Sequence, residues 1–181
     1  MKDRLLVVQY NPDWPKQFVK EKIKLLPALG KSVQAIEHIG STAIIGLAAK
    51  PTIDILIGVE SLNEMNLQSI QALAALQYDY LPKLENQLPE RRFFQKLNQA
   101  GDHLIHLHIT EFKKPFWQRH TLFRNYLIAH PDRAKLYADL KIKLASQFKE
   151  DRQAYTRAKF EFCETINQEA IVWSKNNNLE Y

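Results

Sequence analysis

The spacing of hydrophobic residues predicts several strands and two helices in the first two-thirds of the chain. A helix is expected from the turn at Pro12 to Gly30, because its apolar residues recur every three or four positions. The run at 52–59 is almost continuously apolar, which is typical of a strand inside a sheet. A capping-box pattern at Ser61 predicts a second helix, ending near Gln77. Shorter apolar runs predict strands at 5–10, 33–39, 78–81, 92–97 and 104–110.

From Pro115 onward the pattern becomes helical and remains so. The helices expected there lie at 115–129, from Pro131 onward, and at about 151–174. No internal repeat and no linker-like composition interrupts the sequence. The predicted fold class is therefore α+β, with a mixed sheet flanked by helices and a C-terminal helical extension. We expect a single domain over 1–181, with an α/β core at 1–112 and the helical part at 113–181.

The composition is that of a folded protein. The 181 residues are 45% hydrophobic and 25% charged, which excludes a disordered chain. Cys163 is the only cysteine, so neither an internal disulfide nor a cysteine-based zinc site is expected, and a buried thiol is the default interpretation. The N-terminus does not resemble a signal peptide, and no apolar stretch reaches the ~18 residues that cross a bilayer. We therefore expect a cytoplasmic protein without membrane contact.

Positive charge is concentrated in the C-terminal part. The net charge is +5, and residues 113–159 contain 12 Lys or Arg against 4 Asp or Glu. This excess suggests an anionic ligand that faces the helices, although the charge by itself favours an ordinary solvated helical surface. RNA binding is a third interpretation. Few aromatic residues lie between the basic ones, so nucleic acid is the weakest of the three.

A Gly-Ser turn between two predicted strands carries the most specific chemistry. Gly40 lets a phosphate approach the backbone, Ser41 adds a hydroxyl, and the amides of the turn, which includes Thr42, can point at phosphate oxygens. Asp54, on the strand that follows, is suited to hold Mg²⁺ together with substrate phosphates. A simple turn, with Asp54 ion-paired to Lys50, is the alternative.

The turn and the sequence around it resemble two related groups of proteins. A Gly-Ser turn followed by an aspartate on a strand is similar to the nucleotidyltransferase superfamily, and nearly the whole chain resembles the GrpB family. The segments that carry the resemblance are 10–15, 37–42, 46–56, 91–94, 106–108, 123–127, 137–141 and 151–159. The resemblance implies a nucleotidyltransferase-like fold and, for an active enzyme, transfer of a nucleotidyl group from a nucleoside triphosphate. GrpB-like domains also occur fused to dephospho-CoA kinase, which implies a CoA-related compound as one candidate ligand.

Asp54 lacks the second carboxylate that is usual in a nucleotidyltransferase. The superfamily places two carboxylates two residues apart on one strand face, whereas the neighbours of Asp54 on its face are Thr52 and Leu56. Two metal ions that share a phosphoryl displacement need several anionic oxygens. Either the missing ligands come from elsewhere in the chain, or the protein binds its ligand without catalysis.

Two histidines are the candidates for the missing ligands. His106 and His108 alternate with apolar residues, so both point to one face of their strand. If that strand lies beside the strand of Asp54, the three side chains can hold a divalent cation. Mg²⁺ or Mn²⁺ is expected, with Zn²⁺ as the ion that imidazoles favour. The alternatives are hydrogen bonds from the histidines to phosphate, or partly buried polar side chains without a ligand. His103 is expected on the opposite face and outside the site.

Basic residues inside the same motifs complete the predicted anion site, although a surface position is the alternative for each. They are Lys50, Arg92, Arg124 and Lys159. Tyr155 shares a helix face with Lys159. The hypothesis is a protein that binds a nucleotide or another phosphorylated metabolite together with a divalent cation, with Asp54 as the catalytic carboxylate of a nucleotidyl transfer. The alternative is a non-catalytic module that binds the same small ligand.

Overall fold

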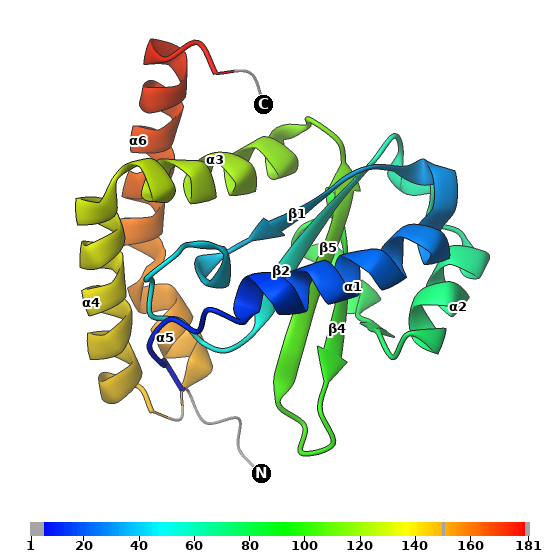
Figure 1. The fold of residues 1–181 in the computed structure, drawn as a ribbon, viewed down its shortest axis with the longest axis horizontal. Coiled ribbons are helices and arrows are strands. Elements are labelled where there is room, and N and C mark those ends of the chain that lie inside the picture. Colours follow the sequence, from blue (N-terminus) through cyan, green and yellow to red (C-terminus); the bar gives the residue numbers. More distant parts are fainter. Residues whose placement is uncertain (1–5, 150, 180–181) are drawn as a thin grey trace.

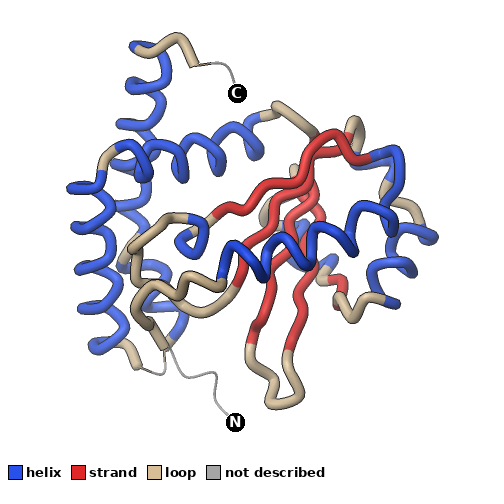
Figure 2. Tube along the Cα trace, viewed as in Figure 1, coloured by secondary structure: helices blue, strands red, loops and turns tan. Residues whose placement is uncertain are grey.

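The structure, a computed structural model, describes residues 6–149 and 151–179 of the chain (Figure 1). A five-stranded sheet lies at its centre, surrounded by helices (Figure 2). The helices are α1 Trp14–Leu29, α2 Leu67–Ala75, α3 Pro115–Ala129, α4 Pro131–Gln147, α5 Arg152–Ala158 and α6 Phe160–Asn176. The strands are β1 Val33–Ile39, β2 Ile53–Val59, β3 Asp79–Tyr80, β4 Arg91–Leu97 and β5 His103–Glu111.

The sheet is mixed, as the sequence predicts, with the strand order β1-β2-β5-β4-β3. β2 and β5 are parallel neighbours, and the other pairs are antiparallel. Ile55 of β2 lies opposite Leu107 of β5, and both side chains are completely buried. The continuously apolar run therefore forms an interior strand, and the predicted α+β class is confirmed.

The two faces of the sheet have different partners. Ile55 and its neighbours on one face pack with Leu25 of α1 and Leu73 of α2 in the main hydrophobic core. Figure 1 shows α1 running across this face. On the other face Leu56 packs against Phe116 of α3. Because side chains alternate along a strand, Asp54 points to the α3 side, away from the main core.

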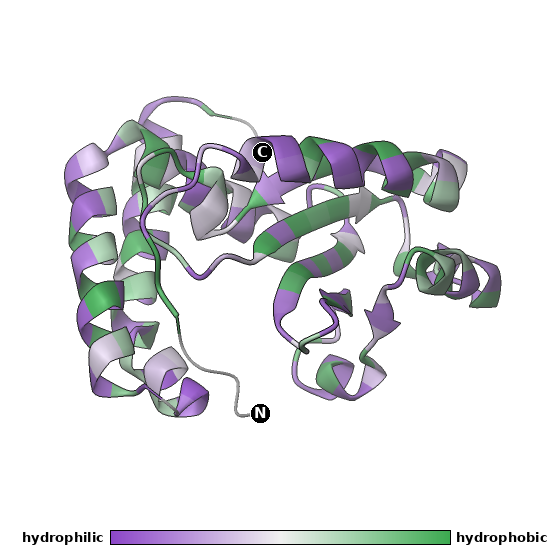
Figure 3. Cartoon of the chain, turned by 60° about the horizontal axis from the view of Figure 1, so that its bottom comes forward, coloured by the Kyte–Doolittle hydropathy of each residue, from purple (hydrophilic) through white to green (hydrophobic). Residues whose placement is uncertain are grey.

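Helices α3 to α6 form a layer beside the sheet. Leu122, Leu127 and Ile166 of this layer pack against Ile44 and Leu47 from the loop after β1. The helices carry both hydrophobic and hydrophilic bands (Figure 3), as expected when one side of each is buried. Within residues 6–149 and 151–179, every helix is too short or too polar to span a bilayer.

The strand predicted at 5–10 does not form in the part of the chain that the structure describes. Val8 makes only an isolated antiparallel bridge with Ala49, in which both amide-to-carbonyl distances are 2.9 Å. Leu5 lies outside the described residues. A single bridge holds the N-terminal segment against the loop that leads into β2, outside the sheet.

The second helix begins later than the sequence predicts. Ser61 accepts a hydrogen bond from the amide of Asn63, but this contact caps only a short 3₁₀ turn. The helix itself starts at Leu67, where the side chain of Asn66 accepts a hydrogen bond from the amide of Ser69 at 3.1 Å. An asparagine caps a helix as well as a serine does. Asn66, which directly precedes Leu67, therefore sets the start of α2.

The last predicted helix is in fact two helices, α5 and α6. Asp151 caps α5, because its side chain accepts a hydrogen bond from the amide of Ala154 at 2.8 Å. The first helix ends at Ala158 and the second begins at Phe160. The break at Lys159 changes the direction of the chain (Figure 1) and leaves this lysine at the junction of the two helices.

Candidate functional site

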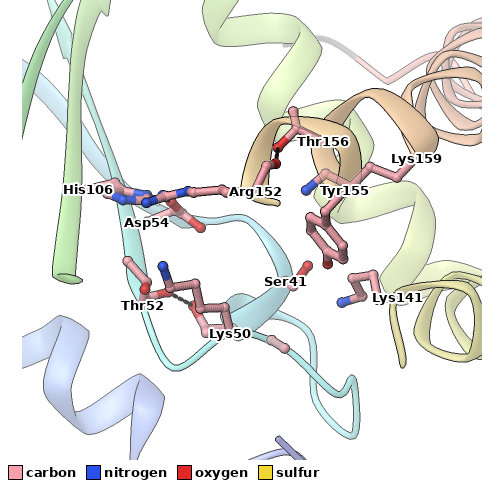
Figure 4. A pocket seen from close by; sticks show the side chains of 12 residues that line it. Ser41, Lys50, Thr52, Asp54, His106, Lys141, Arg152, Tyr155, Thr156 and Lys159 are labelled. Atoms are coloured by element: carbon pink, nitrogen blue, oxygen red, sulfur yellow. Dashed lines mark hydrogen bonds and ion pairs between the residues drawn. The ribbon is translucent and has the colours of Figure 1, made fainter. Parts of the chain in front are cut away.

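A pocket of about 200 Å³ lies where the C-terminal helices meet the beginning of β2, and we call it the lysine pocket (Figure 4). Its lining residues are Ser41, Thr42, Ala49, Lys50, Thr52, Asp54, His106, Lys141, Arg152, Tyr155, Thr156 and Lys159. The predicted site residues that the structure brings together here are Ser41, Thr42, Lys50, Asp54, His106 and Lys159. Segments that are far apart in the sequence therefore form one hollow.

The lysine pocket is strongly positive. Lys50, Lys141, Arg152 and Lys159 line it, and Asp54 is the only carboxylate among its described lining residues. Figure 4 shows Lys141, Tyr155 and Lys159 across the pocket from Asp54, whereas the side chain of Arg152 reaches toward Asp54 and His106. Positive charges gathered around a small hollow repel one another, so the pocket favours an anion.

Lys141 is a site residue that the sequence reasoning missed. It is only 2% exposed, and its ammonium donates a hydrogen bond to the carbonyl oxygen of Ala48 at 2.5 Å. Burial, followed by repulsion from Lys159, lowers the pKa of Lys141 from 10.5 to about 7. A sequence signal exists, because Lys141 lies four residues after Tyr137 and three before Leu144, both of them buried. A lysine on the buried stripe of a helix is unusual and marks a candidate site.

Gly40 faces the carboxylate of Asp54. The φ angle of this glycine is +69°, in the region that favours glycine, and a Cβ atom added to it would lie 2.3 Å from Oδ2 of Asp54. The missing side chain therefore makes room for the carboxylate at the end of β1. The sequence reasoning linked this glycine to a phosphate and missed its contact with Asp54.

Hydrogen-bonded side chains connect Asp54 to the start of α5. His106 Nδ1 lies 3.0 Å from Asp54 Oδ1, and His106 Nε2 lies 3.2 Å from His103 Nδ1. His103 Nε2 in turn lies 3.1 Å from Arg152 Nη1. The prediction that His103 faces away from His106 is wrong. The pairing of β4 with β5 shifts register where His103 lies, so strict alternation does not hold there.

The predicted metal ligands do not converge. His108 is hydrogen-bonded to Arg91, and burial, followed by the charge of Arg91, lowers the pKa of His108 well below 6.5. Among the described residues, no group of three or more His, Cys, Asp or Glu side chains is placed to hold a metal ion. Asp54, His106 and His108 therefore do not fit a preformed three-ligand centre, and the divalent cation stays a prediction.

Thr42 fixes the Gly-Ser turn to its surroundings. Its hydroxyl, which is almost fully buried, donates a hydrogen bond to the carbonyl oxygen of Thr52 at 3.3 Å and lies 3.0 Å from Nε2 of His38. His38 stacks on Phe18 of α1, with ring centroids 4.9 Å apart. The turn is thus held against β2 and α1, which positions Ser41 at the pocket.

A second, larger pocket of about 540 Å³ adjoins the first, and we call it the aromatic pocket. It lies between β4, β5 and the helices α3, α4 and α6, and its rings include those of Phe116, Phe123 and Tyr137. Arg91 and His108 also line it. The sequence reasoning placed His108 with His106, but the two histidines line different pockets.

Arg92 and Arg124, which the sequence predicts in the anion site, line neither pocket. Arg92 pairs with Glu85 at 3.1 Å. Arg124 donates to Glu37 Oε2 at 2.6 Å and to the carbonyl oxygen of His38 at 2.7 Å, and its side chain is 15% exposed. Arg124 thereby ties α3 to β1, which is a structural role.

Comparisons with known proteins give a consistent family. The sequence matches the family described as GrpB protein over residues 4–169. The GrpB protein of Enterococcus faecalis, known from a crystal structure, is 34% identical, with a TM-score of 0.84 that covers 91% of this chain and 96% of that chain. The UPF0157 protein YqkA of Bacillus subtilis is 40% identical over 177 residues, which are 98% of this chain and 50% of that protein. The glutamate-rich protein GrpB of Alkalihalophilus pseudofirmus is 36% identical over 172 residues, which are 93% of this chain and 97% of that protein.

The chain thus spans half the length of the Bacillus subtilis relative and nearly all of the Alkalihalophilus pseudofirmus relative. Its similarity to the Enterococcus faecalis protein extends over most of both structures, so sequence and fold agree. The resemblance seen in the sequence motifs is confirmed. The chain belongs to the GrpB family.

Proposed function

We propose that this protein binds a nucleotide or another small phosphorylated metabolite, with the phosphate in the lysine pocket. The observation that carries the proposal is the convergence of four basic side chains, Lys50, Lys141, Arg152 and Lys159, on a pocket with one carboxylate. An isolated surface lysine needs no ligand, whereas Lys141 is buried and its pKa is lowered to about 7. A bound anion compensates the cost of burying this ammonium.

The pocket offers both kinds of phosphate contact. Arg152 carries a planar guanidinium that can donate two parallel hydrogen bonds, while Lys141 and Lys159 act as point charges. The hydroxyl of Ser41 adds a neutral donor at the turn. Since Lys141 and Lys159 line a pocket of only about 200 Å³, the basic C-terminal part supports a small ligand better than it supports RNA.

Binding without turnover is the form of the proposal that the pocket favours. Asp54 is the only carboxylate among the described residues that line the lysine pocket. In-line transfer assisted by two metal ions needs several anionic ligands. Nucleotidyl transfer, the divalent cation and a CoA-related ligand therefore stay predictions that the following experiments examine.

Isothermal titration calorimetry with tripolyphosphate tests the anion site directly. The intact chain is compared with Lys159→Met, which removes a charge from the pocket, and with Lys175→Met, which removes an exposed lysine from α6. We expect Lys159→Met to weaken binding about tenfold or more and Lys175→Met to leave it within about twofold. Equal effects of the two variants, or no heat of binding to the intact chain, would contradict the proposal.

A second experiment separates binding from catalysis. Nucleoside triphosphates and CoA-related phosphates are added with Mg²⁺, Mn²⁺ or Zn²⁺, and both the melting temperature and pyrophosphate release are recorded. We expect the melting temperature to rise with a bound ligand, because only the folded chain binds it. Pyrophosphate release that disappears in Asp54→Asn would establish the nucleotidyltransferase instead of the binding module.

A further inference from the structure

The lysine pocket and the aromatic pocket share part of their walls. Ser41, Asp54 and Lys159 line both pockets. Tyr137 also connects them, because it lines the aromatic pocket while the ammonium of Lys141 lies 4.5 Å from its ring centroid. A phosphate held beside Ser41 and Lys159 would therefore have the aromatic pocket next to it, and the rest of the ligand has room to extend there.

The walls of the aromatic pocket suit a flat ring. Phe116 is stacked on His120, with centroids 4.1 Å apart and an interplanar angle of 25°. Phe123 lies edge-on to Tyr137, with centroids 5.8 Å apart and an angle of 79°. Rings attract one another through offset-stacked and edge-to-face contacts, so a planar ligand has partners of both kinds here.

Arg91, in the wall of the same pocket, has a buried hydrogen-bond donor that lacks an acceptor. Its Nε atom is buried and has no hydrogen-bond partner among the described residues, while its Nη1 atom is bonded to His108. The guanidinium carbon lies 4.6 Å from the ring centroid of Phe93. An arginine does not lose its charge, and a buried donor without an acceptor is unfavourable. Arg91 lines the pocket, so its guanidinium is the group that can donate to a carbonyl oxygen or ring nitrogen of a ligand there.

The charges around the aromatic pocket do not favour a second phosphate there. Arg119 lines the pocket but is paired with Glu164. The positive charges of Arg91 and Lys159 are matched by two carboxylates in the lining, Asp54 and Glu90. This balance contrasts with the lysine pocket, where four basic residues face one carboxylate. The lining of the aromatic pocket therefore favours an uncharged group.

We infer that the ligand carries an uncharged planar heterocycle in the aromatic pocket, joined to the phosphate in the lysine pocket, as in a nucleoside phosphate. Phe116 and Phe123 contact the ring, and Arg91 donates to one of its acceptors. This inference rests on the proposed function and narrows it from phosphorylated compounds in general to those with a base-like ring.

Calorimetry with matched ligands tests the inference. Tripolyphosphate and ribose 5-phosphate lack the ring, whereas ATP, GTP, CTP and UTP contain it. We expect at least one nucleoside triphosphate to bind about tenfold or more tightly than tripolyphosphate, because a stacked base adds affinity to the phosphate contacts. Ribose 5-phosphate is expected to bind no more tightly than tripolyphosphate.

Variants then assign the preference to the aromatic pocket. Phe123→Leu and Arg91→Lys are expected to lower the nucleotide affinity about tenfold while tripolyphosphate binding stays within about twofold. Phe160→Leu, at an exposed phenylalanine of α6, is the control and should change neither. Circular dichroism shows whether each variant is folded, and a variant that does not fold is replaced by Phe123→Met or Arg91→Gln.

Each outcome separates the inference from the proposed function. If tripolyphosphate binds as tightly as every nucleotide, the inference is overturned while the phosphate site stands. The inference is also overturned if Phe123→Leu and Arg91→Lys lower the affinity for tripolyphosphate and for the nucleotide equally. If neither tripolyphosphate nor any nucleotide binds, the proposed function fails and the inference fails with it.

Discussion

Nδ1 of His106 lies 3.0 Å from Oδ1 of Asp54, and the two residues are direct neighbours in the parallel pairing of β5 with β2. The bond is the first of three that lead through His103 to Arg152. A guanidinium only donates hydrogen bonds and a carboxylate only accepts them. With neutral imidazoles between them, donation can therefore run in one direction only, from Arg152 to Asp54. Each donor then points toward Asp54.

This direction predicts the tautomers of both histidines. We expect the neutral imidazoles of His103 and His106 to carry their protons on Nδ1, because Nε2 of each accepts a hydrogen bond. Nitrogen-15 NMR of labelled protein distinguishes the two ring nitrogens. A proton on Nε2 of His106 would contradict the prediction. Arg152→Met, which removes the first donor, is expected to relax the preference at His103 and to leave the Asp54 contact of His106 in place.

The close contact of Gly40 with Asp54 predicts that a methyl group added at position 40 strongly lowers the stability of the fold. Gly40→Ala is expected to lower the free energy of unfolding by about 3 kcal/mol, from backbone strain and from the collision with the carboxylate. Gly46 is the control, since its φ angle is +80° but an added Cβ meets nothing within 4 Å. Gly46→Ala is expected to cost only the strain, about 1 kcal/mol.

A double variant separates strain from collision at Gly40. If the carboxylate causes most of the loss, combining Gly40→Ala with Asp54→Ala should recover about 1–2 kcal/mol relative to the sum of the single changes. Chemical denaturation of the four proteins provides the measurement. Additive effects would mean that Gly40 does not make room for Asp54.

Arg124 is predicted to support the fold and not the ligand. Its guanidinium bonds to Glu37 and to the carbonyl oxygen of His38, so Arg124→Met leaves a partly buried acceptor on β1 without a partner. We expect the free energy of unfolding to fall by about 2 kcal/mol, while tripolyphosphate affinity stays within about twofold. Arg157→Met, at an exposed arginine of α5, is the control for both measurements. A selective loss of binding with unchanged stability would place Arg124 in the site.

His38 predicts how stability depends on pH. Burial lowers its pKa from 6.5 to about 4, with Arg124 acting in the same direction and Asp54 against it. Above pH 6.5 the imidazole is neutral in both the folded and the unfolded chain. Between pH 6.5 and about 4 only the unfolded chain gains the proton, so stability falls as the pH falls.

The comparison that checks this dependence uses His38→Gln, which keeps a donor for Thr42 but does not titrate. Relative to this variant, the wild-type free energy of unfolding should decrease by up to ~3 kcal/mol across that interval. Urea denaturation at several pH values measures the difference. If the free energy of unfolding depends on pH in the same way in both proteins, the pKa of His38 is not lowered by burial and the prediction is wrong.

Lys141 predicts a conflict between stability and binding. The pKa of Lys141 in the folded chain is about 7, below its ordinary value of 10.5. At and below neutral pH the buried ammonium therefore lowers the stability of the fold. This penalty disappears as the pH rises from about 7 to 10.5, because the lysine loses its proton in the folded chain first. Lys141→Met should therefore raise the free energy of unfolding at pH 7, by roughly 2 kcal/mol after the loss of the bond to Ala48.

The same substitution should weaken tripolyphosphate binding about tenfold, because it removes a charge from the pocket. Lys143→Met, at an exposed lysine of the same helix, serves as the control for both measurements. For the wild type, calorimetry in buffers with different ionisation enthalpies should show proton uptake on binding near pH 7, since the anion raises the pKa of Lys141. Lower stability combined with unchanged binding would mean that Lys141 is only a packing residue.

The candidate site was predictable from sequence where chemistry and chain order coincide. Gly40, Ser41 and Asp54 lie at the ends of neighbouring strands, and the structure places them together. Lys159 was found through its motif, although the helix break that directs it into the pocket was not. Arg91 and Arg92 show the limit, because the Phe93-Phe94 pair is apolar on both faces and alternation cannot tell which arginine faces the site.

The sequence by itself determined most of the elements, the α+β class and the family, because hydrophobic periodicity and turn residues act locally and leave their pattern in the chain. Only the tertiary structure decided which strands are neighbours, and thus that Asp54 meets His106 while His108 meets Arg91. It also decided that Arg124 is held by β1 and that Lys141 lines the pocket. Periodicity shows which side of an element is buried, but the partner of a polar side chain depends on how distant segments pack.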